Sequence, residues 1–135
     1  MIGIILCSHS NFASGLKDAC EMIAGTQEQF EAITFDGTED LLSLGDRLKE
    51  CAKNYQDGCI YVCDLMNGTP FNGCLLAIAE TENVILTGAS VPMVLELVIQ
   101  RNNTTSSPEQ LALKIVQSSQ EYVTMRHSRD IFGNS

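Results

Sequence analysis

The chain is short of aromatic side chains. In 135 residues it has no tryptophan, three tyrosines and five phenylalanines. Flavin sites commonly stack such rings against the cofactor, so this composition disfavours a flavin-binding protein. The glycine fingerprint of dinucleotide sites and the lysine-bearing phosphate loop are also missing from the sequence. The chain therefore lacks the usual sequence signals of a nucleotide site.

Basic side chains are scarce as well. Eight lysines and arginines stand against seventeen aspartates and glutamates, which gives a formal net charge of −9. Nucleic acid and anionic membrane surfaces bind through clustered lysine and arginine, so neither is an expected partner. A basic protein partner suits this charge better.

Long hydrophobic runs are missing. The longest apolar stretches, such as residues 2–7 and 91–99, are far too short to cross a bilayer. Residues 1–7 lack the basic start and the small-residue cleavage site of a signal peptide. We therefore expect a cytoplasmic protein.

The six cysteines form no C-x-x-C pair, and neither histidine lies at a zinc-like spacing from them. No clustered acidic metal site occurs either, so we expect no metal and no cofactor. We interpret the cysteines as reduced, buried thiols in a core that needs no disulfides. Three fall in expected strands and three on expected helix faces: Cys7, Cys59 and Cys63, then Cys20, Cys51 and Cys74.

What the sequence does contain is a regular alternation of strand and helix patterns. Continuous β-rich runs predict strands, and apolar residues at helical spacing predict the helices between them. The expected strands are 2–7, 30–35, 59–63 and 84–87; the expected helices are 16–24, 41–55, one from about residue 70, 91–100, and one carrying Leu111 to Val123. Residues 126–132 form a further short strand or fray.

This order predicts a single α/β domain over residues 1–135, a three-layer sandwich with helices on both faces of a mostly parallel sheet. In such folds the functional crevice lies at the carboxyl ends of the strands. His9, Asp36, Asp64 and Gly88 each follow an expected strand. All four should therefore meet at one edge.

The segment CDLMNGTPFNG, residues 63–73, places Asp64 at a strand end before a helix start. Asn67, Gly68 and Thr69 would offer backbone N–H groups and a hydroxyl where a helix dipole favours an anion. Taken alone, Asn67-Gly68 is equally a turn, Thr69 a helix cap and Asp64 a loop cap.

His9 makes the combination more specific. An imidazole becomes a nucleophile at one ring nitrogen when its other nitrogen donates to a carboxylate. Asp64 is the candidate for that carboxylate, and the helix start would receive phosphoryl oxygens. The residues therefore indicate a chain that carries a phosphoryl group on histidine.

Three motifs now make a family resemblance visible: IILCSHSNFASGL with His9, NGTPFN following Asp64, and GASVPMVLEL at residues 88–97. The chain resembles the IIA component of the mannose/fructose/sorbose-type sugar phosphotransferase system (PTS) of bacteria, over essentially its whole length. The resemblance implies that His9 accepts phosphate from HPr and passes it to a IIB component, which serves the membrane IIC and IID subunits. It further implies that Asp64 orients His9 and that Thr69 binds phosphate.

The resemblance also implies a homodimer in which the last strand, residues 126–132, is exchanged and pairs antiparallel with the partner's sheet. Two residues depart from the family pattern. Ser10 and Asn67 stand where glycine is common. The Ser10 side chain would either add a hydrogen bond to phosphate or crowd the loop.

Three apolar residues should flank the His9 edge as a docking rim for both protein partners, unless they are core residues: Phe12, Met66 and Met93. His127 is far from the motifs and is expected on the surface. The polar tail, residues 133–135, is expected to be disordered.

Two other functions remain open from the sequence. The phosphotransfer subunit of a dihydroxyacetone kinase uses the same chemistry, but NGTPFN argues against it. A non-catalytic flavodoxin-like module that binds an anion or a flavin is the other alternative. The sequence does not identify a sugar, because the resemblance assigns that choice to membrane subunits.

Overall fold

The computed structural model describes residues 1–103 and 106–133. Within them, four parallel strands form one sheet in the order β2-β1-β3-β4. The strands are β1 (Gly3–His9), β2 (Phe30–Phe35), β3 (Cys59–Cys63) and β4 (Val84–Thr87). The helices are α1 (Phe12–Ala24), α2 (Leu41–Ala52), α3 (Thr69–Ile78), α4 (Val91–Arg101), α5 (Pro108–Ser119) and α6 (Ser128–Phe132).

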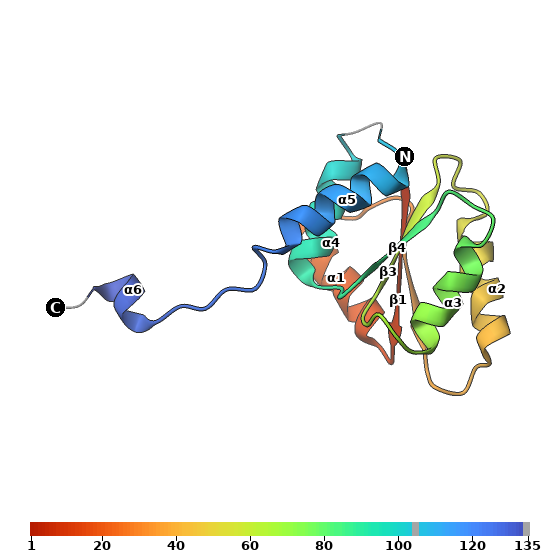
Figure 1. The fold of residues 1–135 in the computed structure, drawn as a ribbon, viewed down its shortest axis with the longest axis horizontal. Coiled ribbons are helices and arrows are strands. Elements are labelled where there is room, and N and C mark those ends of the chain that lie inside the picture. The colour runs from red at the N-terminus through yellow and green to blue at the C-terminus, as the bar shows by residue number, and fades with distance from the viewer. Residues whose placement is uncertain (104–105, 134–135) are drawn as a thin grey trace.

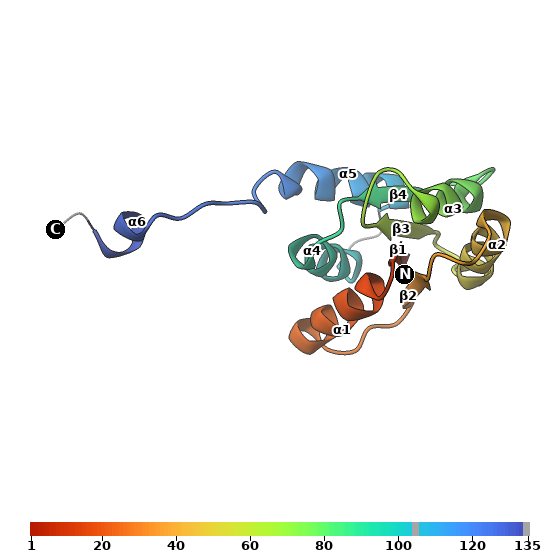
Figure 2. The same cartoon turned by 90° about the horizontal axis from the view of Figure 1, so that it is seen from below.

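The helices cover both faces of this sheet, which confirms the three-layer α/β prediction. Helices α1, α4 and α5 lie on one face, and α2 and α3 lie on the other (Figures 1 and 2). In β1, Ile4 and Leu6 join the first core, whereas Ile5 and Cys7 join the second. Because side chains alternate along a strand, a strand covered on both faces is apolar at successive positions.

The six cysteines are free thiols, five of them buried and Cys51 partly exposed, as predicted for core residues. The Sγ atoms of Cys63 and Cys74 lie 3.4 Å apart between β3 and α3. Hydrogen bonds with the thiols of Cys63 and Cys7, together with burial, raise the pKa of the Cys74 thiol. The raised pKa favours the protonated form of Cys74, and the three buried side chains serve as apolar packing beneath the carboxyl edge of the sheet.

The opposite edge of the sheet is fixed by two contacts. Arg101, only 3% exposed, donates from Nη1 to the carbonyls of Ile2 and Gln29, both at 2.9 Å. This ties the end of α4 to the start of β1. A Cβ atom built on Gly3 would lie 2.0 Å from Cδ2 of Tyr55, so only a glycine in β1 leaves room for that ring.

The C-terminal segment differs from the prediction. Helix α5 ends at Ser119, and Val123, expected on its apolar face, is 92% exposed. The chain then runs away from the body of the molecule (Figures 1 and 2). Residues 128–132, expected as a short strand or a frayed end, form the short helix α6, which a capping box of His127 and Asp130 stabilises.

The sheet strands of the described residues are therefore all parallel, and this single chain has no antiparallel strand at 126–132. Exchange of this segment with a second chain stays a prediction. Of the tail expected to be disordered, residues 134–135 lie outside the described residues. None of the helices in the described ranges is long and apolar enough to cross a bilayer.

Candidate active site

The pairing of β1 with β3 brings His9 to Asp64. The two strands run in parallel with Cys7 opposite Cys63, so both strands end at the same edge of the sheet. Nδ1 of His9 lies 2.9 Å from Oδ2 of Asp64, and the same oxygen accepts the backbone N–H of His9 at 3.1 Å. The predicted His–Asp pair is therefore present in the structure.

The two partners differ in their access to solvent. The His9 side chain is 44% exposed, whereas that of Asp64 is 19% exposed. Asp64 is oriented further by its other oxygen, Oδ1, which accepts the N–H of Leu65 at 3.0 Å. With Nδ1 occupied by this carboxylate, Nε2 is the ring nitrogen left for chemistry.

The start of α3 lies beside that nitrogen. A Cβ atom built on Gly68 would lie 3.2 Å from Nε2 and 3.1 Å from Cε1 of His9. Gly68 has φ of +104°, and no described side chain caps the helix that follows it. A larger residue here would be strained and would crowd the ring. Gly68, the N-cap residue of α3, therefore lies against the ring, with Thr69 half-buried and Asn67 exposed.

The other side of the imidazole faces the end of β2. The ring of Phe35 meets His9 edge-on, with centroids 6.2 Å apart and planes at 76°. Ser10 donates its N–H to the Phe35 carbonyl at 2.8 Å. A hollow of about 440 Å³ opens here, lined by His9, Ser10, Asn11, Thr34, Phe35, Asp36 and Gly37. The backbone N–H of Thr38 holds the pKa of Asp36 below its usual range.

The predicted docking rim needs one correction. Phe12 and Met66 are 45% and 64% exposed, which agrees with a rim position. Met93 is only 5% exposed and packs in the core with Val94, Leu97 and Val98 of α4, so its assignment to the rim is wrong. Leu65, which the sequence analysis missed, is 59% exposed directly after Asp64. His127 is exposed and caps α6, as a surface residue would.

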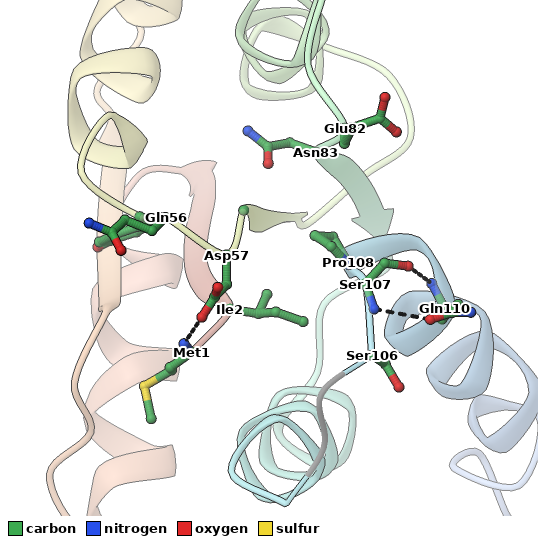
Figure 3. Close-up of a pocket in the computed structure, with 12 residues that line it drawn as sticks. Met1, Ile2, Gln56, Asp57, Glu82, Asn83, Ser106, Ser107, Pro108 and Gln110 are labelled. Carbon is green, nitrogen blue, oxygen red and sulfur yellow. Dashed lines mark hydrogen bonds and ion pairs between the residues drawn. The ribbon is translucent and has the colours of Figure 1, made fainter.

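A larger hollow, of about 790 Å³, lies at the opposite edge of the sheet (Figure 3). Gln56, Asp57, Asn83 and Ser107 line it, together with Pro108 and others. Two of its polar groups already have partners: Asp57 pairs with the terminal amine, and Oδ1 of Asn83 accepts the Cys59 N–H at 2.8 Å. His9 and Asp64 are absent from its described lining. The reactive side chains, and not the volume of the hollow, therefore identify the candidate site.

The residues described in the structure contain no group of three metal-ligating side chains. The fold and the site together define an α/β domain with an exposed histidine, oriented by a carboxylate, next to a helix start. Such an arrangement suits transfer of an anionic group through Nε2.

Comparison with known proteins assigns the family. A family model described as the PTS system fructose IIA component matches residues 3–115. The chain therefore belongs to the IIA components of the mannose/fructose/sorbose-type phosphotransferase systems. It is a phosphotransferase component, as the first of the three hypotheses predicted.

Named relatives agree with this assignment. The chain is 31% identical to the "PTS system sorbose-specific EIIA component" of Lacticaseibacillus casei, covering 90% of this chain and 88% of that one. It is 28% identical to a fructose-specific EIIA component of Bacillus subtilis, covering 84% and 75%. A solved EIIA structure from Streptococcus agalactiae matches with a TM-score of 0.83 and 28% identity, over 93% of this chain and 97% of that chain.

The backbone of Ser10 generates a first prediction. Its φ of +53° is left-handed, which explains why glycine suits this position. Glycine adopts this conformation without the steric cost that serine has, and this gain exceeds the entropy that glycine adds to the unfolded chain. Ser10→Gly should therefore stabilise the protein by about 0.5 kcal/mol. Urea unfolding measures this. Ser118→Gly in α5 is the matched control and should destabilise by about 0.5 kcal/mol. Equal losses in both variants would contradict the prediction.

Proposed function

We propose that His9 carries the phosphoryl group of this IIA component, accepting it from the phosphohistidine of HPr and passing it to a IIB component. One observation carries the proposal: Asp64 engages Nδ1, while Nε2 lies beside the start of α3. Family membership supplies the partners, and the geometry supports the acceptor atom.

In the transfer step, the lone pair of His9 Nε2 attacks phosphorus while the phosphorus–nitrogen bond of the donor breaks. The donor imidazole keeps the electron pair of that bond. The His9 ring, still protonated at Nδ1, gains positive charge, which the carboxylate of Asp64 at 2.9 Å stabilises. Transfer to IIB reverses these roles. The protein's part is positioning and charge stabilisation, as phosphoryl transfer generally requires.

The phosphoryl oxygens would lie at the helix start. Gly68 leaves space next to the ring, and the N–H groups of the first turn of α3 bring the positive end of the helix dipole. Thr69 and Asn67 add a hydroxyl and an amide on the same loop, and Ser10 adds a hydroxyl on the other side of His9. We propose that Ser10, Asn67, Gly68 and Thr69 together bind the phosphoryl group.

Partner docking would use the apolar rim around His9. Phe12 and Met66 are exposed, and Leu65 extends the rim beside Asp64. The net charge of −9 suits basic partner faces. The membrane IIC and IID subunits would be reached only through IIB.

The exposed C-terminal segment supports a homodimer. Val123, Met125, Ile131 and Phe132 are 92%, 76%, 62% and 81% exposed, which leaves a row of apolar side chains in solvent. A second copy of the chain could cover them by pairing residues of this segment with its sheet edge. We propose that residues after Tyr122 form the exchanged part of such a dimer.

The first prediction here concerns the acceptor. With enzyme I, HPr and phosphoenolpyruvate, the protein should gain one acid-labile, base-stable phosphoryl group, and His9→Ala should abolish it. Intact-mass spectrometry at neutral and acid pH measures the gain. His127→Ala is the matched control and should be labelled like the wild type, because it lies on the C-terminal segment. Labelling of His9→Ala at the wild-type rate would refute the proposal.

The second concerns Asp64. Asp64→Asn keeps the shape of the side chain, but an amide can present either its donor or its acceptor to Nδ1. The unreactive ring tautomer then competes, and single-turnover transfer from phospho-HPr should slow by on the order of a hundredfold. Rapid-quench kinetics measures the rate, and nitrogen NMR reads the tautomer. An unchanged rate and tautomer would show that Asp64 only caps its loop.

The third concerns assembly. A chain that ends at Tyr122 loses the exposed apolar segment and should be monomeric where the full chain is a dimer. Light scattering at micromolar concentration distinguishes the two. A full-length protein that is monomeric under these conditions would disprove strand exchange.

A further inference from the structure

We propose that Ser8 is a positioning residue for His9, acting through its hydroxyl on the backbone on both sides of the histidine. This proposal rests on the proposed function of His9. Ser8 is 2% exposed, and among the described residues only Ser8 and Arg101 are polar or charged and also buried. A buried hydroxyl that directly precedes an exposed reactive side chain calls for a physical reason.

The contacts of the hydroxyl give that reason. Oγ of Ser8 accepts the backbone N–H of Ala13 at 2.6 Å and donates to the carbonyl of His9 at 3.2 Å. Ala13 is the second residue of α1 and is 1% exposed. The hydroxyl therefore links the end of β1 to the first turn of the next helix, across the loop that carries His9.

Helix α1 depends on this link. Within the described residues, Asn11 occupies the N-cap position of α1 but gives it no side-chain hydrogen bond. In α4 and α5 the cap residue itself does this work, through Ser90 and Ser107. In α1 the capping hydroxyl comes instead from Ser8, three residues before the N-cap.

His9 is thereby held by side chains at both of its backbone polar groups. Oδ2 of Asp64 accepts its N–H at 3.1 Å, and Oγ of Ser8 donates to its carbonyl. The next residue, Ser10, adopts the left-handed φ of +53°. A strained residue persists only where its surroundings hold it, and here Ser8 and Ala13 close the loop around it.

Loss of the hydroxyl would release this loop. The buried N–H of Ala13 and the carbonyl of His9 would lose a partner, and the loop would relax away from the left-handed turn. The imidazole would then shift relative to Gly68 and Asp64, while the chemical groups of the site all remain. Because phosphoryl transfer depends on close alignment, we expect single-turnover transfer from phospho-HPr to slow by about tenfold to a hundredfold.

The experiment compares Ser8→Ala with Ser107→Ala, which removes a helix-capping serine at the opposite edge of the sheet. Both should lower the midpoint of thermal unfolding, so rates are measured well below either midpoint. Ser8→Ala should slow transfer at least about tenfold and reduce the fraction of His9 protonated at Nδ1 in nitrogen NMR. Ser107→Ala should leave both readouts unchanged, and Ser8→Thr, which restores the hydroxyl, should recover most of the rate.

The proposal would be overturned if Ser8→Ala and Ser107→Ala had equal transfer rates and equal His9 tautomer populations. It would also be overturned if Ser8→Thr were as slow as Ser8→Ala. If Ser8→Ala does not fold, Ser8→Cys replaces it, since sulfur keeps the bulk but accepts hydrogen bonds weakly. A wild-type rate in Ser8→Cys would overturn the proposal too. The tautomer measurement needs no phosphoryl transfer. Failure of wild-type labelling would therefore refute the function of His9 while leaving the role of Ser8 testable.

Discussion

The parallel register between β1 and β3 is the constraint on which the rest of the structure depends. Both strands are buried on their two faces, so neither can slip by a residue without moving apolar side chains out of two cores. With Cys7 fixed opposite Cys63, His9 and Asp64 leave the sheet side by side. The core thus determines the distance between two partly exposed groups that contribute little to folding themselves.

The two edges of the sheet are built differently. At one edge, Arg101 joins α4 to β1 through backbone carbonyls, and the chain there is fixed by a buried cation. At the other edge the strands end in loops, where hydrogen bonds from side chains hold part of the backbone. Ser8 and Asp64 bond the backbone of His9 in this way. The site is therefore rigid where the reacting ring is attached and open where a partner protein must approach.

Much of this could be predicted because the sheet is apolar and regular. The runs 30–35, 59–63 and 84–87 gave the observed strands, and their order brought His9 to Asp64. Met93 was assigned to the rim because its segment was expected to flank the His9 edge, whereas its helical spacing from Leu97 places both side chains in one core. The strand expected at 126–132 is absent from this single chain, in which residues 128–132 form a short helix with no buried side chain. The hydroxyl of Ser8 left no sequence signal, since capping from three residues before the N-cap follows no common motif.

Gly3 and Tyr55 illustrate how a contact restricts which sequences this fold accepts. A methyl group on Gly3 and the ring of Tyr55 cannot occupy the same space, since the atoms would lie 2.0 Å apart. The two positions are 52 residues apart in the chain (55 − 3) yet share one volume. A larger side chain at position 3 therefore requires a smaller one at position 55. In related sequences such a pair would appear as covariation between strand and loop, unrelated to the chemistry at the far edge.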